Sequence, residues 1–182
     1  MKAALAARFD AHLSEIDAAP RDVGRVEMIV RRPAIGEREV LKEAAVDPVF
    51  GVVGDDWVRR SSRSTVDGRP DVRTQVTLMS VRVLNALAPE RATWAWAGDQ
   101  FLIDFDLSVE ALPPGTRLVI GSAVLEVGDK PHAACAKFAA RFGTDALRWL
   151  NSAEGRSRRL RGVNARAIAG GTVRVGDEIR RA

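Results

Sequence analysis

The single cysteine of the chain, Cys135, carries the side chain with the greatest chemical potential. It lies in the stretch KPHAACAKFAARF, three residues after His132 and shortly before Lys137 and Arg141. If a helix begins at the proline of this stretch, the thiol lies in its first turns, where the helix dipole and nearby cations favour the thiolate. A thiolate is a nucleophile and a ligand for soft metals. The same pattern also suits a buried thiol among alanines and phenylalanines, a common location for a free cysteine.

Arginines are the second group that could bind a ligand. A guanidinium fork matches phosphate oxygens with two parallel hydrogen bonds. Four arginines lie between two glycines of one short segment: Arg156, Arg158, Arg159 and Arg161. A solvated basic surface is the alternative role for such a run. Arg166 stands beside Asn164 in an alternating stretch, where an inward-facing guanidinium would be a further anion anchor.

Other reactive groups are few. Gly54-Asp55 and Gly98-Asp99 are candidate carboxylate sites, and each also has the composition of a turn at a strand end. The two histidines are far apart and offer little choice of base for a Ser/His/Asp triad. One cysteine excludes an internal disulfide and a Cys-rich zinc site. No glycine-rich phosphate loop precedes a predicted helix.

The charge balance allows anions as ligands without demanding nucleic acid. The chain has 28 Lys and Arg against 24 Asp and Glu, a formal net charge of +4. Four tryptophans among basic residues could stack on bases, but no RNA- or DNA-binding motif accompanies them and tyrosine is absent. Nucleic acid is therefore not favoured as a partner.

Among the elements that must position these residues, the first segment predicts an amphipathic helix. Leu5, Phe9, Leu13 and Ile16 recur at spacings of four, four and three, which aligns them on one stripe. Pro20 ends the pattern, because the residue before proline resists the helical conformation. We expect residues 1–20 to form a helix packed on the domain, with a partner-binding helix as the alternative.

Most of the remaining chain predicts short strands. Alternation and turn residues indicate a hairpin over residues 24–46, a strand over 100–107, and paired strands over 116–127 and 163–179. Helical composition appears at residues 81–87, 131–142 and 145–150, with Gly143 as a C-cap candidate. The polar residues 59–73 predict a surface loop.

Many short strands with few long helices argue against a doubly wound sheet. The sequence predicts a mostly β protein, a small β-barrel with peripheral α-helices (α+β), in which residues 21–182 form one domain. A hydrophobic content of 46% over 182 residues suffices for a core without disulfides. The N-terminal apolar run is too short for a signal peptide and no stretch is long enough to span a membrane, so we expect a cytoplasmic protein without membrane partners.

The order of motifs resembles that of the MOSC domain, the module found at the C-terminus of molybdenum-cofactor sulfurases. The motifs in chain order are GVVGD at residues 51–55, IGSAVLEV at 120–127, CAKF at 135–138 and GTVRVGD at 171–177. The resemblance extends over residues 24–180, nearly the whole chain. It implies a mostly β, barrel-like fold and a link to the molybdenum cofactor (molybdopterin).

The resemblance also implies a role for the cysteine. In that family one cysteine is held to carry sulfur or to ligate molybdenum, and Cys135 occupies the matching place. A cofactor with a phosphate tail needs cationic anchors, and we expect Lys137, Arg141, Arg166 and His132 to bind it. Many relatives place a histidine shortly after the Gly-Asp that matches Gly54-Asp55, whereas this chain has Trp57, so no role is carried over from that histidine.

The resemblance leaves two activities open: a carrier of sulfur or cofactor, and a molybdenum-dependent reductase of N-hydroxylated compounds. The sequence contains no pyridoxal-phosphate, ferredoxin or flavin domain, so the sulfur or electrons are expected from a separate donor protein.

Two other functions compete with these. One is a non-catalytic binding module that presents residues 156–161 and 61–69 to an acidic partner or nucleic acid. The other is a thiol redox protein, which would need an external resolving thiol.

Overall fold

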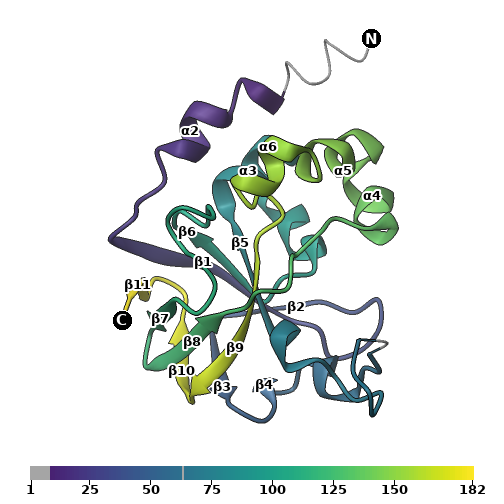
Figure 1. Cartoon of the computed structure of the whole chain (residues 1–182), viewed down its shortest axis with the longest axis vertical. Coiled ribbons are helices and arrows are strands. Elements are labelled where there is room, and N and C mark those ends of the chain that lie inside the picture. The colour runs from purple at the N-terminus through teal and green to yellow at the C-terminus, as the bar shows by residue number, and fades with distance from the viewer. Residues whose placement is uncertain (1–8, 63) are drawn as a thin grey trace.

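The computed structural model describes residues 9–62 and 64–182, and its centre is a closed β-barrel (Figure 1). Seven strands follow one another around the ring in the order β11-β7-β8-β9-β5-β6-β1, and β1 pairs with β11 to close it. The strand β2 extends the ring from β1, and a second sheet has the order β10-β3-β4. The strands are β1 (Val23–Arg31), β2 (Glu39–Leu41), β3 (Glu43–Asp47), β4 (Gly51–Val52), β5 (Val76–Ser80), β6 (Phe101–Asp104), β7 (Arg117–Ile120), β8 (Ala123–Val127), β9 (Val163–Ala169), β10 (Gly171–Arg174) and β11 (Glu178–Arg181). This confirms the predicted fold class.

The helices are short and cluster at one end of the barrel (Figure 1). They are α2 (Leu13–Asp17), α3 (Val81–Leu87), α4 (Ala136–Phe142), α5 (Thr144–Leu150) and α6 (Ala153–Ser157), with 3-10 turns η1 (Asp56–Arg59), η2 (Val72–Thr74) and η3 (Arg91–Ala97). The prediction for α3 is confirmed at both ends, since Ser80 caps its start through Arg82 N and Pro89 follows its end. Gly143, with φ +92°, follows α4 as predicted.

One pair of neighbouring strands is parallel. β5 pairs with β6 in parallel register, Leu78 opposite Phe101, whereas every other described pairing is antiparallel. A parallel pair needs a crossover connection, and residues 81–100 provide it through α3 and η3. The Gly98-Asp99 turn lies at the end of this crossover, between η3 and β6.

One sequence prediction needs correction here. Within the hairpin predicted over residues 24–46, β1 pairs with β2 but not with β3. The chain bends at Lys42, whose carbonyl accepts from Val175, and β3 joins the second sheet. Trp94 and Trp96 lie in the η3 turns. Trp94 is buried and donates to the Ala88 carbonyl, while Trp96 is 43% exposed.

Two hydrophobic cores stabilise the molecule. The first fills the barrel with side chains such as Ile29, Leu78 and Phe101, each fully buried. The second lies between the barrel and the helices and includes Leu84 and Trp149. Burying such side chains is worth roughly 1.5–3 kcal/mol each, so the second core fixes the helical end against the barrel.

The predicted N-terminal stripe contributes to the second core where it is described. Phe9 and Ile16 are buried, Leu13 packs against the same core, and the Phe9 ring stacks on Trp149 at 5.0 Å between centroids. Leu5 lies outside the described residues. The division between residues 1–20 and 21–182 stays a prediction.

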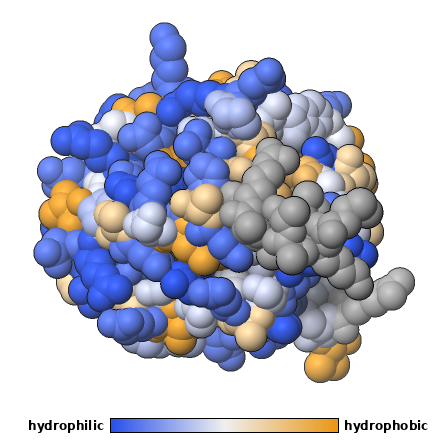
Figure 2. All heavy atoms as spheres, turned by 90° about the horizontal axis from the view of Figure 1, so that it is seen from above, coloured by the Kyte–Doolittle hydropathy of each residue, from blue (hydrophilic) through white to orange (hydrophobic). Residues whose placement is uncertain are grey.

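No helix in residues 9–62 and 64–182 is long and apolar enough to cross a membrane. Seen from above in Figure 2, the helical end is a mosaic in which hydrophilic residues surround scattered apolar ones.

Candidate functional site

A pocket of about 1200 Å³ opens beside α4 and collects most of the residues with candidate chemistry. Its walls come from the loop after β1, the predicted surface loop at residues 59–62 and 70–74, the Gly98 turn, α4 and the start of β9. The charged and potentially reactive lining residues are Arg32, Arg38, Asp56, Arg59, Arg60, Asp71, His132, Cys135, Lys137, Arg141 and Arg161.

Cys135 is exposed and lines this pocket. The structure corrects its expected position in the helix: α4 begins at Ala136 rather than near Pro131, so Cys135 is the N-cap residue in an extended conformation. Residues 131–135 have no regular secondary structure. The alternative of a buried apolar thiol is therefore excluded, and the thiol faces the lining of the pocket.

Three of the four predicted cofactor-binding residues line the same pocket. Lys137 and Arg141 project from α4, and His132 lies in the segment before it. Arg166 does not join them. Its guanidinium pairs with Glu126 of β8 at 2.7 Å, with its side chain half exposed, so the expected inward orientation is wrong. Arg166 points outward because its neighbours Ala165 and Ala167 are the buried positions of β9.

Two buried ion pairs hold the pocket wall. The Asp55 carboxylate, completely buried, accepts from Arg32 Nη2 at 2.7 Å and Nε at 2.8 Å and from the backbone amides of Arg32 and Trp57. Those hydrogen bonds and the Arg32 charge outweigh burial and lower the pKa of Asp55. Beside it, Arg161 donates to Asp99 at 2.6 Å and to the Ala97 carbonyl, while Arg32 also donates to the Gly98 carbonyl between them.

Both carboxylates were singled out in the sequence as Gly-Asp turns, and Arg161 as a candidate anion-binding arginine, but the pairing of each carboxylate with an arginine was not predicted. Arg32 and Arg161 lie 23 and 62 residues away from their partners along the chain, so only the tertiary fold brings each pair together. Gly54 and Gly98 both have positive φ, +84° and +91°, which glycine adopts without the steric penalty of a side chain. The turn signal in the sequence was therefore correct, and the carboxylates serve the wall rather than a carboxylate pair.

Several cations of the pocket have no carboxylate partner. Within the part of the chain that the structure describes, no acidic side chain lies within 4 Å of the charged groups of Arg38, Arg59, Lys137 or Arg141. Arg59 and Arg141 instead donate to the backbone carbonyls of Pro33 and Trp96. An excess of unpaired positive charge in a concave site attracts anions.

Arg38 and Arg141 meet at Trp96. Their guanidinium carbons lie 5.7 and 5.6 Å from the centroid of its ring, so both contribute cation–π contacts to one indole. Burial, followed by the charges of Arg141, Arg32 and Arg60, lowers the pKa of Arg38. The sequence offered no signal for Arg38, since it lies in a polar loop nearly 100 residues before Cys135.

Unsatisfied polar atoms concentrate at the same site. Four buried side-chain atoms of the described residues have no hydrogen-bond partner: Arg38 Nε, Asp99 Oδ1, His132 Nδ1 and Arg161 Nε. Three of the residues line the pocket, and Asp99 contacts two of them. A buried polar atom without a partner costs roughly 1–3 kcal/mol, and such a cost is characteristic of a binding or catalytic site.

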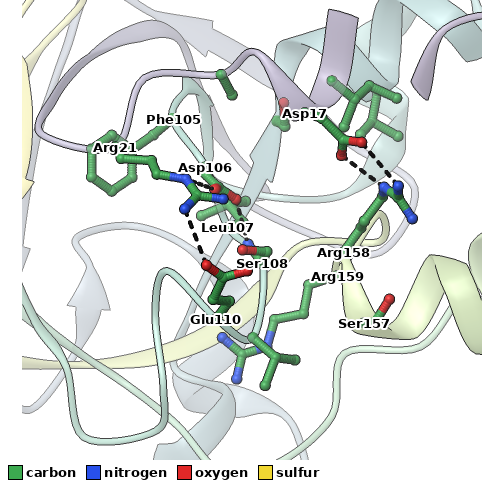
Figure 3. A pocket seen from close by; sticks show the side chains of 15 residues that line it. Asp17, Arg21, Phe105, Asp106, Leu107, Ser108, Glu110, Ser157, Arg158 and Arg159 are labelled. Carbon is green, nitrogen blue, oxygen red and sulfur yellow. Dashed lines mark hydrogen bonds and ion pairs between the residues drawn. The ribbon is translucent and has the colours of Figure 1, made fainter. Parts of the chain in front are cut away.

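A second pocket of about 650 Å³ lies on the side of the barrel where α2 and the end of α6 approach residues 105–110. Its charges are largely matched, as Figure 3 shows: Arg158 pairs with Asp17 at 2.7 Å, and Arg21 with Asp106 at 2.9 Å. The arginines of the predicted basic segment therefore have different roles. Arg158 links α6 to α2 through its ion pair with Asp17, and Arg159 donates to a backbone carbonyl. Arg161 is buried at the first pocket, where it pairs with Asp99.

Several solved structures have a fold similar to that of this chain. The YuaD protein from Bacillus subtilis is 18% identical, with a TM-score of 0.60 over 86% of this chain and 94% of that one. YiiM from Geobacillus stearothermophilus gives 13% identity and a TM-score of 0.57 over 87% and 75%, and YiiM from Escherichia coli 16% and 0.56 over 87% and 69%. No curated protein matches the sequence significantly. The family model of the MOSC domain matches residues 72–180, more than half of the chain, and the protein therefore belongs to the MOSC domain family.

Proposed function

We propose that this stand-alone MOSC domain protein binds the molybdenum cofactor in the pocket beside α4, with the Cys135 thiolate as the protein's ligand to molybdenum. The observation that carries the proposal is the convergence of one exposed thiol and four cations without carboxylate partners on a single pocket. A thiolate suits a soft metal centre, and guanidinium groups suit a phosphate.

The residues present fit this group better than a bare metal ion. No cluster of three His, Cys, Asp or Glu side chains suitable for a metal lies in the described ranges, so the protein alone cannot complete a coordination shell. A cofactor that brings its own sulfur ligands needs only one more from the protein. The volume of about 1200 Å³ exceeds that of an ordinary small-molecule site and leaves room for a second ligand.

Each side chain then has a defined task. When bound, the cofactor would supply a redox-active metal centre. Cys135 would hold the metal at the pocket edge, because its position at the N-cap leaves the thiol outside the helix. Lys137, Arg141 and Arg38 would hold the anionic tail, while the ion pair of Arg161 and Asp99 keeps the wall beneath in place.

Two activities are compatible with such binding. A sulfur or cofactor carrier would need Cys135 accessible to a donor protein, and its exposure meets that need. A reductase of N-hydroxylated compounds would need space for substrate beside the metal and a separate electron donor. Assay of the loaded protein with N-hydroxylated substrates and an artificial electron donor distinguishes the two, because only the reductase turns them over.

The test is metal and pterin analysis of protein purified from a host that makes the cofactor. Wild type is expected to carry near-stoichiometric molybdenum and pterin. Cys135→Ala is expected to lose molybdenum, and Arg141→Ala to lose most of both. Arg166→Ala is the matched control: it removes an arginine of the same domain that lies outside the pocket, and should retain the cofactor.

Absence of molybdenum and pterin from folded wild type would overturn the proposal. Equal retention by Cys135→Ala would remove the thiol from the binding role and leave only the anion pocket. Thermal unfolding of each variant establishes that a loss of cofactor is not a loss of fold.

A further inference from the structure

In the wall of the pocket, a buried histidine nitrogen and a buried carboxylate oxygen face each other without a hydrogen bond. His132 Nδ1 lies 3.6 Å from Asp99 Oδ1, and neither atom has a hydrogen-bond partner among residues 9–62 and 64–182. The distance is too long for a hydrogen bond, but a small rotation of the imidazole would bring it into range. The other Asp99 oxygen is already engaged by Arg161 at 2.6 Å.

A neutral His132 has one ring proton for two neighbouring acceptors. A hydrogen bond with the Val163 backbone raises the pKa of the ring, as a bond to a carbonyl acceptor does, while Nδ1 faces Asp99 Oδ1 without a hydrogen bond. A neutral ring that donates its proton to the backbone therefore leaves the Nδ1 lone pair opposite a carboxylate oxygen. One additional proton on Nδ1 would turn two unsatisfied acceptors into a charge-assisted hydrogen bond.

The charges around the ring oppose that proton. Burial, and then the positive charges of Arg161 and more distantly Arg32, lower the pKa of His132 to about 3, while Asp99 and the Val163 backbone act in the opposite direction. With Arg161 already neutralising Asp99, protonation would leave a net positive charge in a wall where only 15% of the His132 side chain is exposed. An anion in the pocket would supply the missing negative charge, because Arg32, Arg161 and His132 all line it.

We propose that His132 and Asp99 form a proton-binding pair that couples anion binding in the pocket to the uptake of one proton. The proton comes from solvent, binds Nδ1, and is donated to Asp99 Oδ1; no other bond changes. The inference rests on the anion-binding part of the proposed function and does not require molybdenum. Its consequence is a ligand affinity that rises as the pH falls.

The direct test is a histidine NMR titration of the wild-type protein with and without inorganic sulfate, an anion that does not itself titrate near neutral pH. The chain has only two histidines, and His12 lies in the N-terminal segment beside Glu15, so it serves as an internal control. At saturating sulfate the midpoint of His132 is expected to rise by at least one pH unit while that of His12 stays unchanged.

Calorimetry in buffers of different ionisation enthalpy counts the protons directly. We expect uptake of at most one proton per sulfate, largest at pH values between the midpoints of His132 in the free and the sulfate-bound protein. His132→Gln should abolish this uptake and His12→Gln should preserve it. Sulfate that binds in the pocket without moving the His132 midpoint overturns the inference but leaves the cofactor proposal standing. Failure of sulfate to bind at all overturns it as well, whereas the molybdenum analysis tests the cofactor independently.

Discussion

Arg32 donates two side-chain hydrogen bonds of 2.7 and 2.8 Å to the Asp55 carboxylate. The side chain of Asp55 is fully buried, and that of Arg32 is only 7% exposed. The pair joins the end of β1 to the loop after β4, and Arg32 also donates to the Gly98 carbonyl. Three chain segments therefore meet at one guanidinium on the pocket wall.

Breaking that pair is expected to be costly. Asp55→Ala leaves a buried guanidinium without its counter-ion, and we expect a loss of about 3–5 kcal/mol in the free energy of unfolding. Chemical denaturation measures this. Glu126→Ala, which removes the partner of the exposed Arg166, is the control and should cost less than about 1 kcal/mol. Similar losses in the two variants would contradict the argument from burial.

The free energy of unfolding is expected to fall as the pH falls, in part because His132 is buried in its neutral form. Its pKa in the folded protein, about 3, lies below the ordinary value of 6.5, so the unfolded chain binds more protons between these values. The contribution is fully present above about pH 6.5 and is lost as the pH falls toward 3, with a slope of at most about 1.4 kcal/mol per pH unit.

Denaturation curves measured at several pH values test this slope. In His132→Gln the component should disappear, and in His12→Gln it should remain. A slope that is identical in wild type and His132→Gln would show that the buried imidazole does not cause it. The lowered pKa values of Asp55 and Asp71 add a second loss below about pH 4, which both variants should retain.

Anion affinity should depend on the arginines that line the pocket and not on arginines elsewhere in the domain. Arg38→Ala and Arg141→Ala each remove a charge that has no carboxylate partner, and each is expected to weaken binding of inorganic pyrophosphate roughly tenfold to a hundredfold, as for a charge-assisted hydrogen bond. Isothermal titration calorimetry measures the affinity. Arg166→Ala should bind like wild type, and an equal loss in that variant would point to net charge rather than to the pocket.

Gly162, between Arg161 and β9, should be irreplaceable for a steric reason. Its φ is +96°, and a Cβ there would lie 2.1 Å from the Leu78 carbonyl oxygen. Gly162→Ala is expected to lose roughly 1–2 kcal/mol for the left-handed backbone and about 1–3 kcal/mol more for overpacking.

Gly115→Ala is the control for this substitution. Gly115 has a similar φ, +87°, but a Cβ added there would meet no other atom within 4 Å, so only the backbone cost applies. Thermal and chemical unfolding of both variants separate the cost of the left-handed backbone from the cost of the steric clash with Leu78. Equal destabilisation would mean that the strand beside Leu78 yields to the added methyl group.

The sequence predicted local features well because turn and helix signals are local. The helix predicted over residues 81–87 is α3, and the predicted C-cap Gly143 ends α4. The chemistry of Cys135 with Lys137 and Arg141 was also visible, since all three lie within seven residues. Arg38, Arg161 and Asp99 could not be grouped, because only the side-by-side pairing of β1, β6, β5 and β9 brings the loops that carry them together.

Arg166 shows the opposite limit. Alternation in β9 correctly indicated a strand, but which face of it points inward depends on the register with β8, where Arg166 lies opposite Glu126. A shift of one residue would have turned the guanidinium inward. Periodicity defines the two faces of a strand, and only its neighbours decide which face meets solvent.

The closure of the ring between β1 and β11 has a consequence for biosynthesis. Residues 23–25 can pair with residues 178–180 only after the ribosome has released nearly the whole described chain. Until then β1 has a free edge, which is a site for wrong pairing with other nascent chains. The closed barrel therefore forms only after β11 has been translated.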